Sequence, residues 1–199
     1  MTDYNTNDYH KYFFDAQVKG GYTTTHYHGL VNLHQKGAQW LYDRGVKTAF
    51  EIGSGLGFFL QGAKRVGIDA KGYDINPYER DFAISKGIDP GNYILGVPDQ
   101  FGIDGEYDAF YSVEVFEHIV NETLIPLVEQ IAEKGKFFFF TSTPNYTTPE
   151  ADAEWGHINI KPVEDWIAFF EKHGLKFHSL NKTVCAWGIV MTGKRYQPG

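Results

Sequence analysis

Three glycines at alternate positions, Gly53, Gly55 and Gly57, follow an apolar run that contains the acidic residue Glu51. Glycine adopts positive φ values and has no Cβ, so its backbone can approach a ligand closely. A second apolar run begins at Phe58, and the first turn of a helix there would offer free N–H groups. This pattern of strand, tight turn and helix start predicts a loop that binds a nucleotide-like ligand.

The spacing of the glycines narrows the class of ligand. Dinucleotide-binding loops have the spacing G-x-G-x-x-G, whereas the spacing here is G-x-G-x-G. The sequence also has no Gly-Lys-Ser/Thr, which a phosphate-binding loop would contain. Asp74 ends a predicted strand, and one carboxylate in that position can accept hydrogen bonds from both hydroxyls of a ribose.

Taken together, these features resemble the class I S-adenosylmethionine-dependent methyltransferases. The first motif of that family, acid-x-Gly-x-Gly-x-Gly, is matched by residues 51–57, and its second motif, an acid at the end of the second strand, by Asp74. Residues 107–119, YDAFYSVEVFEHI, are similar to the family's fourth-strand signature. Residues 141–145, TSTPN, resemble the fifth-strand end of small-molecule methyltransferases of the ubiquinone-biosynthesis type.

The resemblance covers about residues 46–195 and implies S-adenosyl-L-methionine as cofactor, with S-adenosyl-L-homocysteine as product. Family members often place an acid just after the third strand, but here the first acid after Gly96 is Asp99, which leaves Phe101 as an alternative cover for the adenine. The expected cofactor-binding residues are Glu51, Gly53, Ser54, Gly55, Gly57, Asp74, Ile75, Asp99, Gln100, Phe101, Ser112 and Val113.

Apolar periodicity from residue 46 onward alternates between strand and helix. Strands are predicted at 46–52, 70–74, 92–96, 107–113, 136–142, 175–180 and 184–192, and helices at 58–66, 77–86, 121–133 and 162–173. The pattern predicts an α/β fold: a three-layer Rossmann-like sandwich with a seven-stranded, mostly parallel sheet and one antiparallel C-terminal strand. We expect a single methyltransferase domain over 1–199, with an N-terminal helical cap or lid at 1–45 and a Rossmann-like core at 46–195.

The first 30 residues are rich in Tyr, His and Asn. They predict a short helix near 8–18, a glycine break and a segment packed over a pocket, followed by a helix over 30–42. His26 and His28 would point the same way on an extended segment, but no Cys or carboxylate accompanies them at a recognisable ligand spacing. We therefore expect contact with the substrate there, and no metal. The expected substrate-binding residues are Tyr22, His26, His28, Asn145 and Tyr146.

Two further histidines are candidates for a catalytic base, because imidazole suits proton transfer near neutral pH. His118 follows the predicted fourth strand in Glu117-His118, although the pair could instead serve to start the next helix. His157 comes after the polar loop 145–157, which would overhang the pocket.

Composition excludes several classes of function. The chain has 199 residues, a formal net charge of −7 and one cysteine, so it has no internal disulfide, and its acidity argues against nucleic-acid binding. It contains no apolar run of the roughly 20 residues that span a bilayer, and its N-terminus lacks the pattern of a signal peptide. We expect a cytoplasmic monomer or homodimer that acts on a small molecule and not at a membrane.

The leading hypothesis is O-methylation of a sugar or a related polar metabolite. An alternative is N-methylation of a small amine, a nucleic acid or a protein. Enzymes that methylate the amino groups of bases usually carry Asp/Asn-Pro-Pro-aromatic after the fourth strand, where this chain has residues 112–115, SVEV. A further alternative is a non-catalytic module that binds the cofactor, against which the intact glycine loop argues.

Overall fold

The computed structural model describes residues 6–96, 102–143, 148, 150, 152 and 155–198. The chain divides into two compact units, Met1–Val97 and Pro98–Gly199. The division falls after the third strand, so each unit contains its own strands, helices and buried residues.

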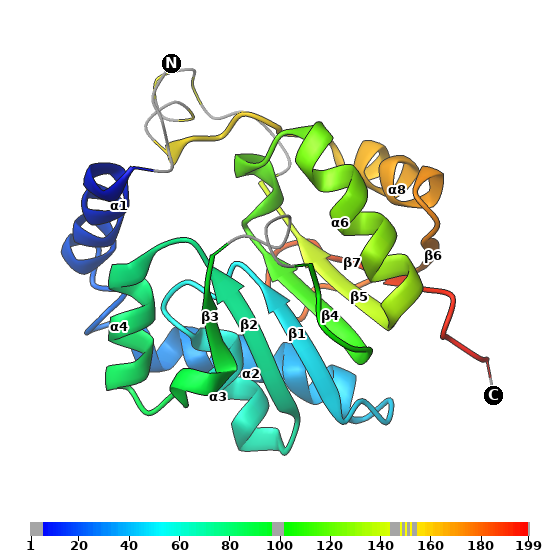
Figure 1. The fold of residues 1–199 in the computed structure, drawn as a ribbon, viewed down its shortest axis with the longest axis horizontal. Coiled ribbons are helices and arrows are strands. Elements are labelled where there is room, and N and C mark those ends of the chain that lie inside the picture. Colours follow the sequence, from blue (N-terminus) through cyan, green and yellow to red (C-terminus); the bar gives the residue numbers. More distant parts are fainter. Residues whose placement is uncertain are drawn as a thin grey trace. The chain divides into compact units, whose positions relative to one another are not determined.

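The first unit contains three parallel strands, β1 (Thr48–Ile52), β2 (Asp69–Asp74) and β3 (Tyr93–Leu95), in the order β3-β2-β1. In the register of these strands, Ile52 pairs with Tyr73 and Asp74 with Leu95. Helices α3 (Phe58–Val66) and α4 (Pro77–Ser85) make the connections, with a short 3₁₀ turn at Pro90–Asn92 (Figure 1). The carboxyl ends of β1 and β2 therefore meet at one edge of this part of the sheet.

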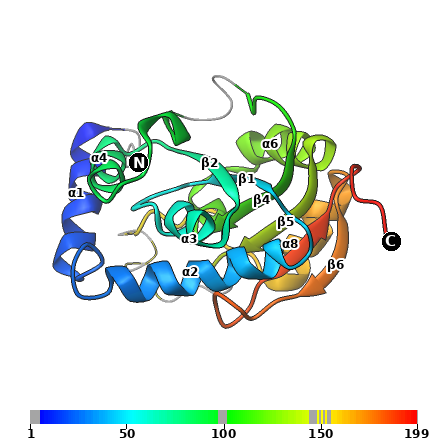
Figure 2. The same ribbon diagram turned by 90° about the horizontal axis from the view of Figure 1, so that it is seen from below.

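Two N-terminal helices pack on these connections. Helix α1 (Asn7–Lys19) lies against α4, where Phe14 stacks on Tyr78 with 6.2 Å between ring centroids. Helix α2 (Tyr27–Tyr42) packs across α3 (Figure 2). A Cβ on Gly62 of α3 would lie 2.7 Å from the backbone nitrogen of Gln35, so only glycine allows this close crossing.

Helix α2 begins at Tyr27, three residues before the predicted start, and His26 is its N-cap with a helical backbone. The prediction that His26 and His28 lie on an extended segment was therefore wrong. Residues two apart on a helix point in different directions, because successive side chains are about 100° apart. The helical period was hidden because the first turn contains Tyr, His and Gly in place of aliphatic residues.

The second unit contains β4 (Tyr107–Val113), β5 (Gly135–Thr141), β6 (Lys176–Leu180) and β7 (Ile189–Thr192), with helices α6 (Asn121–Lys134) and α8 (Val163–Lys172) and a 3₁₀ turn at Phe116–His118. Strands β4 and β5 are parallel, whereas β7 is antiparallel to both β5 and β6. The fully buried side chains of Phe138 and Phe140 on β5 pack against Phe170 of α8.

The strands form one seven-stranded sheet with the order β3-β2-β1-β4-β5-β7-β6. The sheet is parallel apart from β7, which confirms the predicted fold class. Strand β7 begins at Ile189, five residues later than predicted, because residues 183–186 form bends. Within the described part of the chain, no helix is long and apolar enough to cross a membrane.

Candidate functional site

The glycine loop leaves β1 as a tight turn whose glycines all have positive φ, with values of 74° at Gly53, 47° at Gly55 and 78° at Gly57. The N–H groups of Gly53 and Ser54 donate to the carbonyl of Tyr73 at 3.0 and 2.8 Å, which ties the loop to β2. At Gly57, a Cβ would also lie only 3.0 Å from that of Ala83. Backbone conformation and lack of space therefore both require glycine here.

Asp74, at the carboxyl end of β2, holds the loop from the other side. One carboxylate oxygen accepts from the N–H of Gly55 at 2.8 Å, and the other from the N–H of Asn76 at 2.9 Å. Burial raises the pKa of Asp74, while hydrogen bonds from the backbone at Asn76, Gly55 and Ile75 oppose the rise. These three donors leave about one of the four acceptor sites of the carboxylate, so Asp74 can accept a further hydrogen bond from a ligand.

Two more carboxylates lie beside the loop. Glu51 and Glu79 are 4% and 3% exposed, and burial raises the pKa of each well above its usual value, with the charge of Asp74 adding to the rise. The Oε2 atom of Glu51 is buried without a hydrogen-bond partner. An Oε1 atom of Glu79 lies 3.5 Å from the position that a Cβ of Gly55 would take.

Sequence reasoning missed Glu79, since an acid in the first turn of a helix usually serves only to favour that helix. Its proximity to Gly55 depends on how α4 packs against the loop, which the local sequence does not reveal. Tyr93 was also missed: its hydroxyl donates to the carbonyl of Gly55 at 2.7 Å and so fixes the same peptide.

This part of the site fits a ligand that carries adjacent hydroxyl groups and positive charge. The buried carboxylates of Glu51 and Glu79 and the half-buried one of Asp74 attract a cation, and the unpartnered oxygen of Glu51 would be satisfied by an ammonium or sulfonium-bearing group nearby. The bare backbone of Gly53–Gly57 lets such a ligand lie close to the chain.

The remaining expected cofactor residues are spread over the chain. Ile75 is half-buried beside Asp74. Ser112 and Val113 end β4 in the second unit, where Ser112 is fully buried and its hydroxyl has no hydrogen-bond partner. Asp99, Gln100 and Phe101 lie outside the described residues.

In the second unit, the structure brings His118 and His157 together, with 5.0 Å between their ring centroids. Burial, followed by the neighbouring His157, lowers the pKa of His118 to about 4, so its ring is neutral near pH 7. The Nδ1 atom of His157 lies 3.1 Å from a carboxylate oxygen of Asp152. Sequence reasoning proposed each histidine separately, and nothing in the sequence indicated that they are adjacent.

The expected substrate-binding residues are less closely associated. Tyr22 is 42% exposed, and His26 and His28 are exposed at the start of α2. Asn145 and Tyr146 lie outside the described residues. No two of the three described residues are joined by a contact that would define a pocket, so their role in binding substrate stays a prediction.

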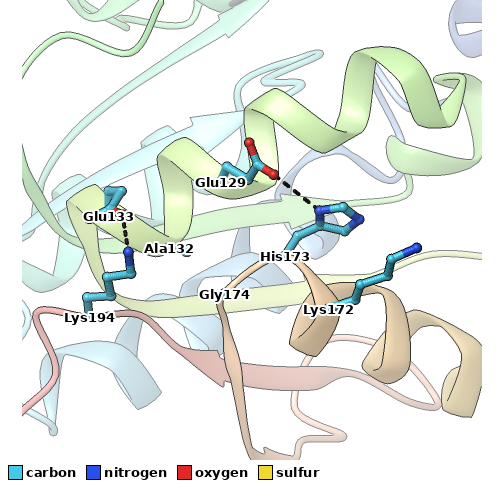
Figure 3. A pocket seen from close by; sticks show the side chains of 7 residues that line it. All are labelled: Glu129, Ala132, Glu133, Lys172, His173, Gly174 and Lys194. Carbon is cyan, nitrogen blue, oxygen red and sulfur yellow. Dashed lines mark hydrogen bonds and ion pairs between the residues drawn. The ribbon is translucent and has the colours of Figure 1, made fainter.

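A shallow pocket of about 290 Å³ lies elsewhere in the second unit (Figure 3). Its charged side chains pair across it: Lys194 contacts Glu133, and His173 lies 3.3 Å from Glu129. The pocket is near Gly135, at the amino end of β5, whereas His118 follows the carboxyl end of β4. Strand β5 is about 20 Å long, so this pocket is separate from the histidine pair. Its lining residues are Glu129, Ala132, Glu133, Lys172, His173, Gly174 and Lys194.

Comparison with known proteins supports a fold assignment. No protein-family model matches the sequence, and neither does any curated protein. A methyltransferase from Archaeoglobus fulgidus described as S-adenosylmethionine-dependent is similar in structure, with a TM-score of 0.67, 18% identity and coverage of 91% of this chain and 99% of that one. Magnesium protoporphyrin IX methyltransferase from Synechocystis PCC 6803, solved with bound S-adenosylhomocysteine, has a TM-score of 0.64, 14% identity and coverage of 93% and 95%.

The mitomycin 7-O-methyltransferase MmcR has a TM-score of 0.61 and 16% identity over 81% of this chain, which spans only 52% of MmcR. At these identities the likeness concerns the fold, and it confirms the resemblance drawn from the motifs at that level. The finer resemblance to enzymes of ubiquinone biosynthesis stays a prediction. This chain has the fold of the class I S-adenosylmethionine-dependent methyltransferases.

Proposed function

We propose that this chain transfers a methyl group from S-adenosyl-L-methionine to an oxygen atom of a small polar metabolite, such as a sugar. The observation that carries the proposal is the arrangement at the carboxyl ends of β1 and β2, where Asp74 holds the N–H of Gly55 beside two buried acids. S-Adenosylmethionine has a ribose, a sulfonium and an ammonium group, each of which matches a feature of this arrangement.

The residues around the glycine loop would then each contact a different part of the cofactor. Asp74 accepts a hydrogen bond from a ribose hydroxyl with its remaining acceptor site. The unpartnered Oε2 of Glu51 accepts from the ammonium group. Gly53, Gly55 and Gly57 leave the backbone accessible to the cofactor. The bound cofactor supplies a methyl group activated by the positive sulfur, so the protein must mainly hold the reactants in line and exclude water.

Methylation of a hydroxyl also requires that a base take its proton. His118 is one candidate: its imidazole is neutral near pH 7, but its pKa of about 4 makes it a weaker base than a histidine that titrates near neutral pH. His157 is the second candidate, and Asp152 orients its ring through Nδ1. Oxygen as the acceptor is further supported by the fold likeness to a protein described as a mitomycin 7-O-methyltransferase.

Thermal unfolding in the presence of ligands tests the cofactor. S-Adenosylhomocysteine should raise the midpoint temperature of thermal unfolding, because a ligand that binds only the folded state stabilises that state. NAD serves as the control, since its pyrophosphate needs the glycine spacing that this loop lacks. No shift with S-adenosylhomocysteine would refute the proposal.

The acceptor is tested by incubating the protein with S-adenosylmethionine and a panel of polar metabolites that differ in the reacting atom. Release of S-adenosylhomocysteine with hydroxyl-bearing compounds, together with the mass of the methylated product, supports O-methylation. Release only with amines would contradict the choice of oxygen while leaving the cofactor assignment intact.

A further inference from the structure

We propose that Glu117, His118 and His157 form a binding site for a divalent transition-metal ion. Each residue offers one ligand atom, and the three atoms lie within 4.8 Å of one another. Ligands of one ion at bond lengths of about 2.1 Å are about 3–4 Å apart. The three side chains therefore need to shift by only about 1 Å to enclose an ion, at a place where no metal was predicted.

Backbone hydrogen bonds hold the two segments that carry these ligands together. The carbonyl of Glu117 accepts from the N–H groups of Ile158 and Asn159 at 2.8 and 2.9 Å. The side-chain amide of Asn159 donates to the carbonyl of Ile119 at 2.7 Å. The accepting carbonyls flank His118, and the donors directly follow His157, so His157 is fixed against the turn that carries Glu117 and His118.

Each ligand also has an outer partner of the kind that orients ligands in metal sites. The Nδ1 atom of His157 faces a carboxylate oxygen of Asp152, which is 3% exposed. The ring of His118 hydrogen-bonds the backbone at Gly156 and Trp155. These contacts orient the two rings.

The carboxylate of Glu117 is also oriented by neighbouring hydrogen-bond donors. Its side chain is fully buried, and its Oε2 accepts from the hydroxyl of Ser142 at 2.8 Å. Its Oε1 lies 3.4 Å from both the N–H and the hydroxyl of Thr143, which is close to the limit for a hydrogen bond. A buried carboxylate is costly without a strong partner, and a dication at Oε1 would provide one.

A second carboxylate lies next to the cluster. Glu114 has a φ of 56° and is the one non-glycine residue with positive φ among the described residues. Its oxygens accept from the hydroxyls of Thr141 and Thr143 at 3.0 and 2.9 Å. Backbone strain of this kind persists where surrounding contacts impose it. The carboxyl group of Glu114 also lies within hydrogen-bonding reach of Glu117, and a cation beside two such neighbouring acids would stabilise both as carboxylates.

The donor set indicates the class of ion. Two imidazoles and one carboxylate suit Zn²⁺, Fe²⁺, Mn²⁺ or Co²⁺, whereas Ca²⁺ prefers oxygen ligands alone and Cu⁺ prefers sulfur. Three protein ligands leave coordination positions open. If the proposed function holds, an acceptor hydroxyl could occupy one of them, and the ion would then lower the pKa of that hydroxyl. A ring nitrogen that binds the ion cannot also take a proton, so in the metal-bound protein the ion would replace the histidine base in activating the hydroxyl.

The site can be tested by binding alone. The full chain is freed of metal with a chelator and titrated with Co²⁺ in the absence of cofactor, and the visible absorption of the bound ion reports its ligands. We expect one Co²⁺ per chain. The His157→Ala and Glu117→Gln variants should each lose affinity at least about 30-fold. His28→Ala, which removes an exposed histidine of α2, should bind as the wild type does.

His157→Gln, which keeps a polar group beside Asp152, guards against loss of folding, and circular dichroism checks each variant. Wild-type affinity in folded His157 variants would overturn the proposal, and so would a wild-type spectrum without features of nitrogen ligands. Stabilisation by S-adenosylhomocysteine is measured on the same samples. If Co²⁺ does not bind but S-adenosylhomocysteine still stabilises the protein, the metal site is refuted and the proposed function is not. If Co²⁺ binds but S-adenosylhomocysteine has no effect, the proposed function is refuted and the metal site is not.

Discussion

The glycine loop of the first unit and the cluster of Glu117, His118 and His157 in the second unit are built in different ways. The loop is a short continuous segment whose backbone is exposed by positive φ, and Asp74 is its main side-chain support. The cluster is formed by side chains from two segments far apart in the sequence, joined by bonds to the carbonyl of Glu117.

This difference shows which kind of site can be recognised from one sequence. The loop depends on residue types at fixed spacing, because only glycine tolerates those φ values and that close approach. The cluster depends on how residues 155–159 return to the end of β4, and that return is set by tertiary hydrogen bonds. The two regions should also respond independently to substitution, which the following experiments test.

The largest effect is expected from Asp74→Ala. The affinity for S-adenosylhomocysteine should fall about 100-fold, or about 2.7 kcal/mol, because hydrogen bonds to a charged group contribute about 1.5–3 kcal/mol. Calorimetric titration measures the loss. Asp69→Ala, at the exposed first residue of the same strand, is the matched control. If Co²⁺ binding also fell in the Asp74 variant, the two regions would not be independent.

His34 on α2 is a buried histidine that serves in packing, and it can be compared with the two histidines of the cluster. Burial lowers its pKa to about 4 from 6.5, and its ring lies 5.7 Å from that of Phe58. The unfolded chain therefore takes up a proton between pH 6.5 and 4 that the folded chain does not. Stability contributed by His34 is complete above pH 6.5 and is lost as the pH falls, by about 2 kcal/mol between pH 7 and 5.

Urea unfolding at pH 7 and pH 5 measures this loss. The His34→Gln variant should lose about 2 kcal/mol less than the wild type over that range, whereas His28→Gln, at an exposed position of the same helix, should behave as the wild type does. An unchanged pH dependence in His34→Gln would show that the pKa of His34 is the same in the folded and the unfolded chain.

The Ser142→Ala variant tests whether the hydrogen-bond partner of Glu117 contributes to metal binding. The hydroxyl of Ser142 donates to Oε2 of Glu117 at 2.8 Å in a fully buried position. Its removal should weaken Co²⁺ binding about tenfold, as expected for an outer partner of a metal ligand. Binding of S-adenosylhomocysteine provides the internal control, and a fall in both affinities would point to a general loss of structure instead.

The smallest effect is expected from Glu79→Gln. Its carboxylate lies near Gly55, so it should favour the positively charged S-adenosylmethionine over the uncharged sulfur of S-adenosylhomocysteine. The substitution should lower the affinity ratio of the two ligands about fivefold, which corresponds to about 1 kcal/mol. Competition titration measures the ratio. An unchanged ratio would exclude Glu79 from recognition of the sulfonium.

Much of the fold could be predicted because strands and helices alternate with strong apolar periodicity. The predicted bounds of α3 and β4 coincide with those observed, at Phe58–Val66 and Tyr107–Val113. The predictions failed where the deciding contacts are distant: the first turn of α2 is polar, and the proximity of Glu79 to Gly55 depends on packing of α4. For the same reason His118 and His157 were predicted as separate candidates, with no metal between them.

The close crossing of α2 and α3 at Gly62 limits how the chain can be shortened. A truncated chain that begins at Val46 would retain every strand of the sheet and the glycine loop. It would nevertheless uncover the flank of α3 on which Val31, Ala38 and Leu41 of α2 are now buried. Such a truncation should aggregate, so expression tags and fusion partners belong ahead of α1, and library designs should treat the first helices as indispensable.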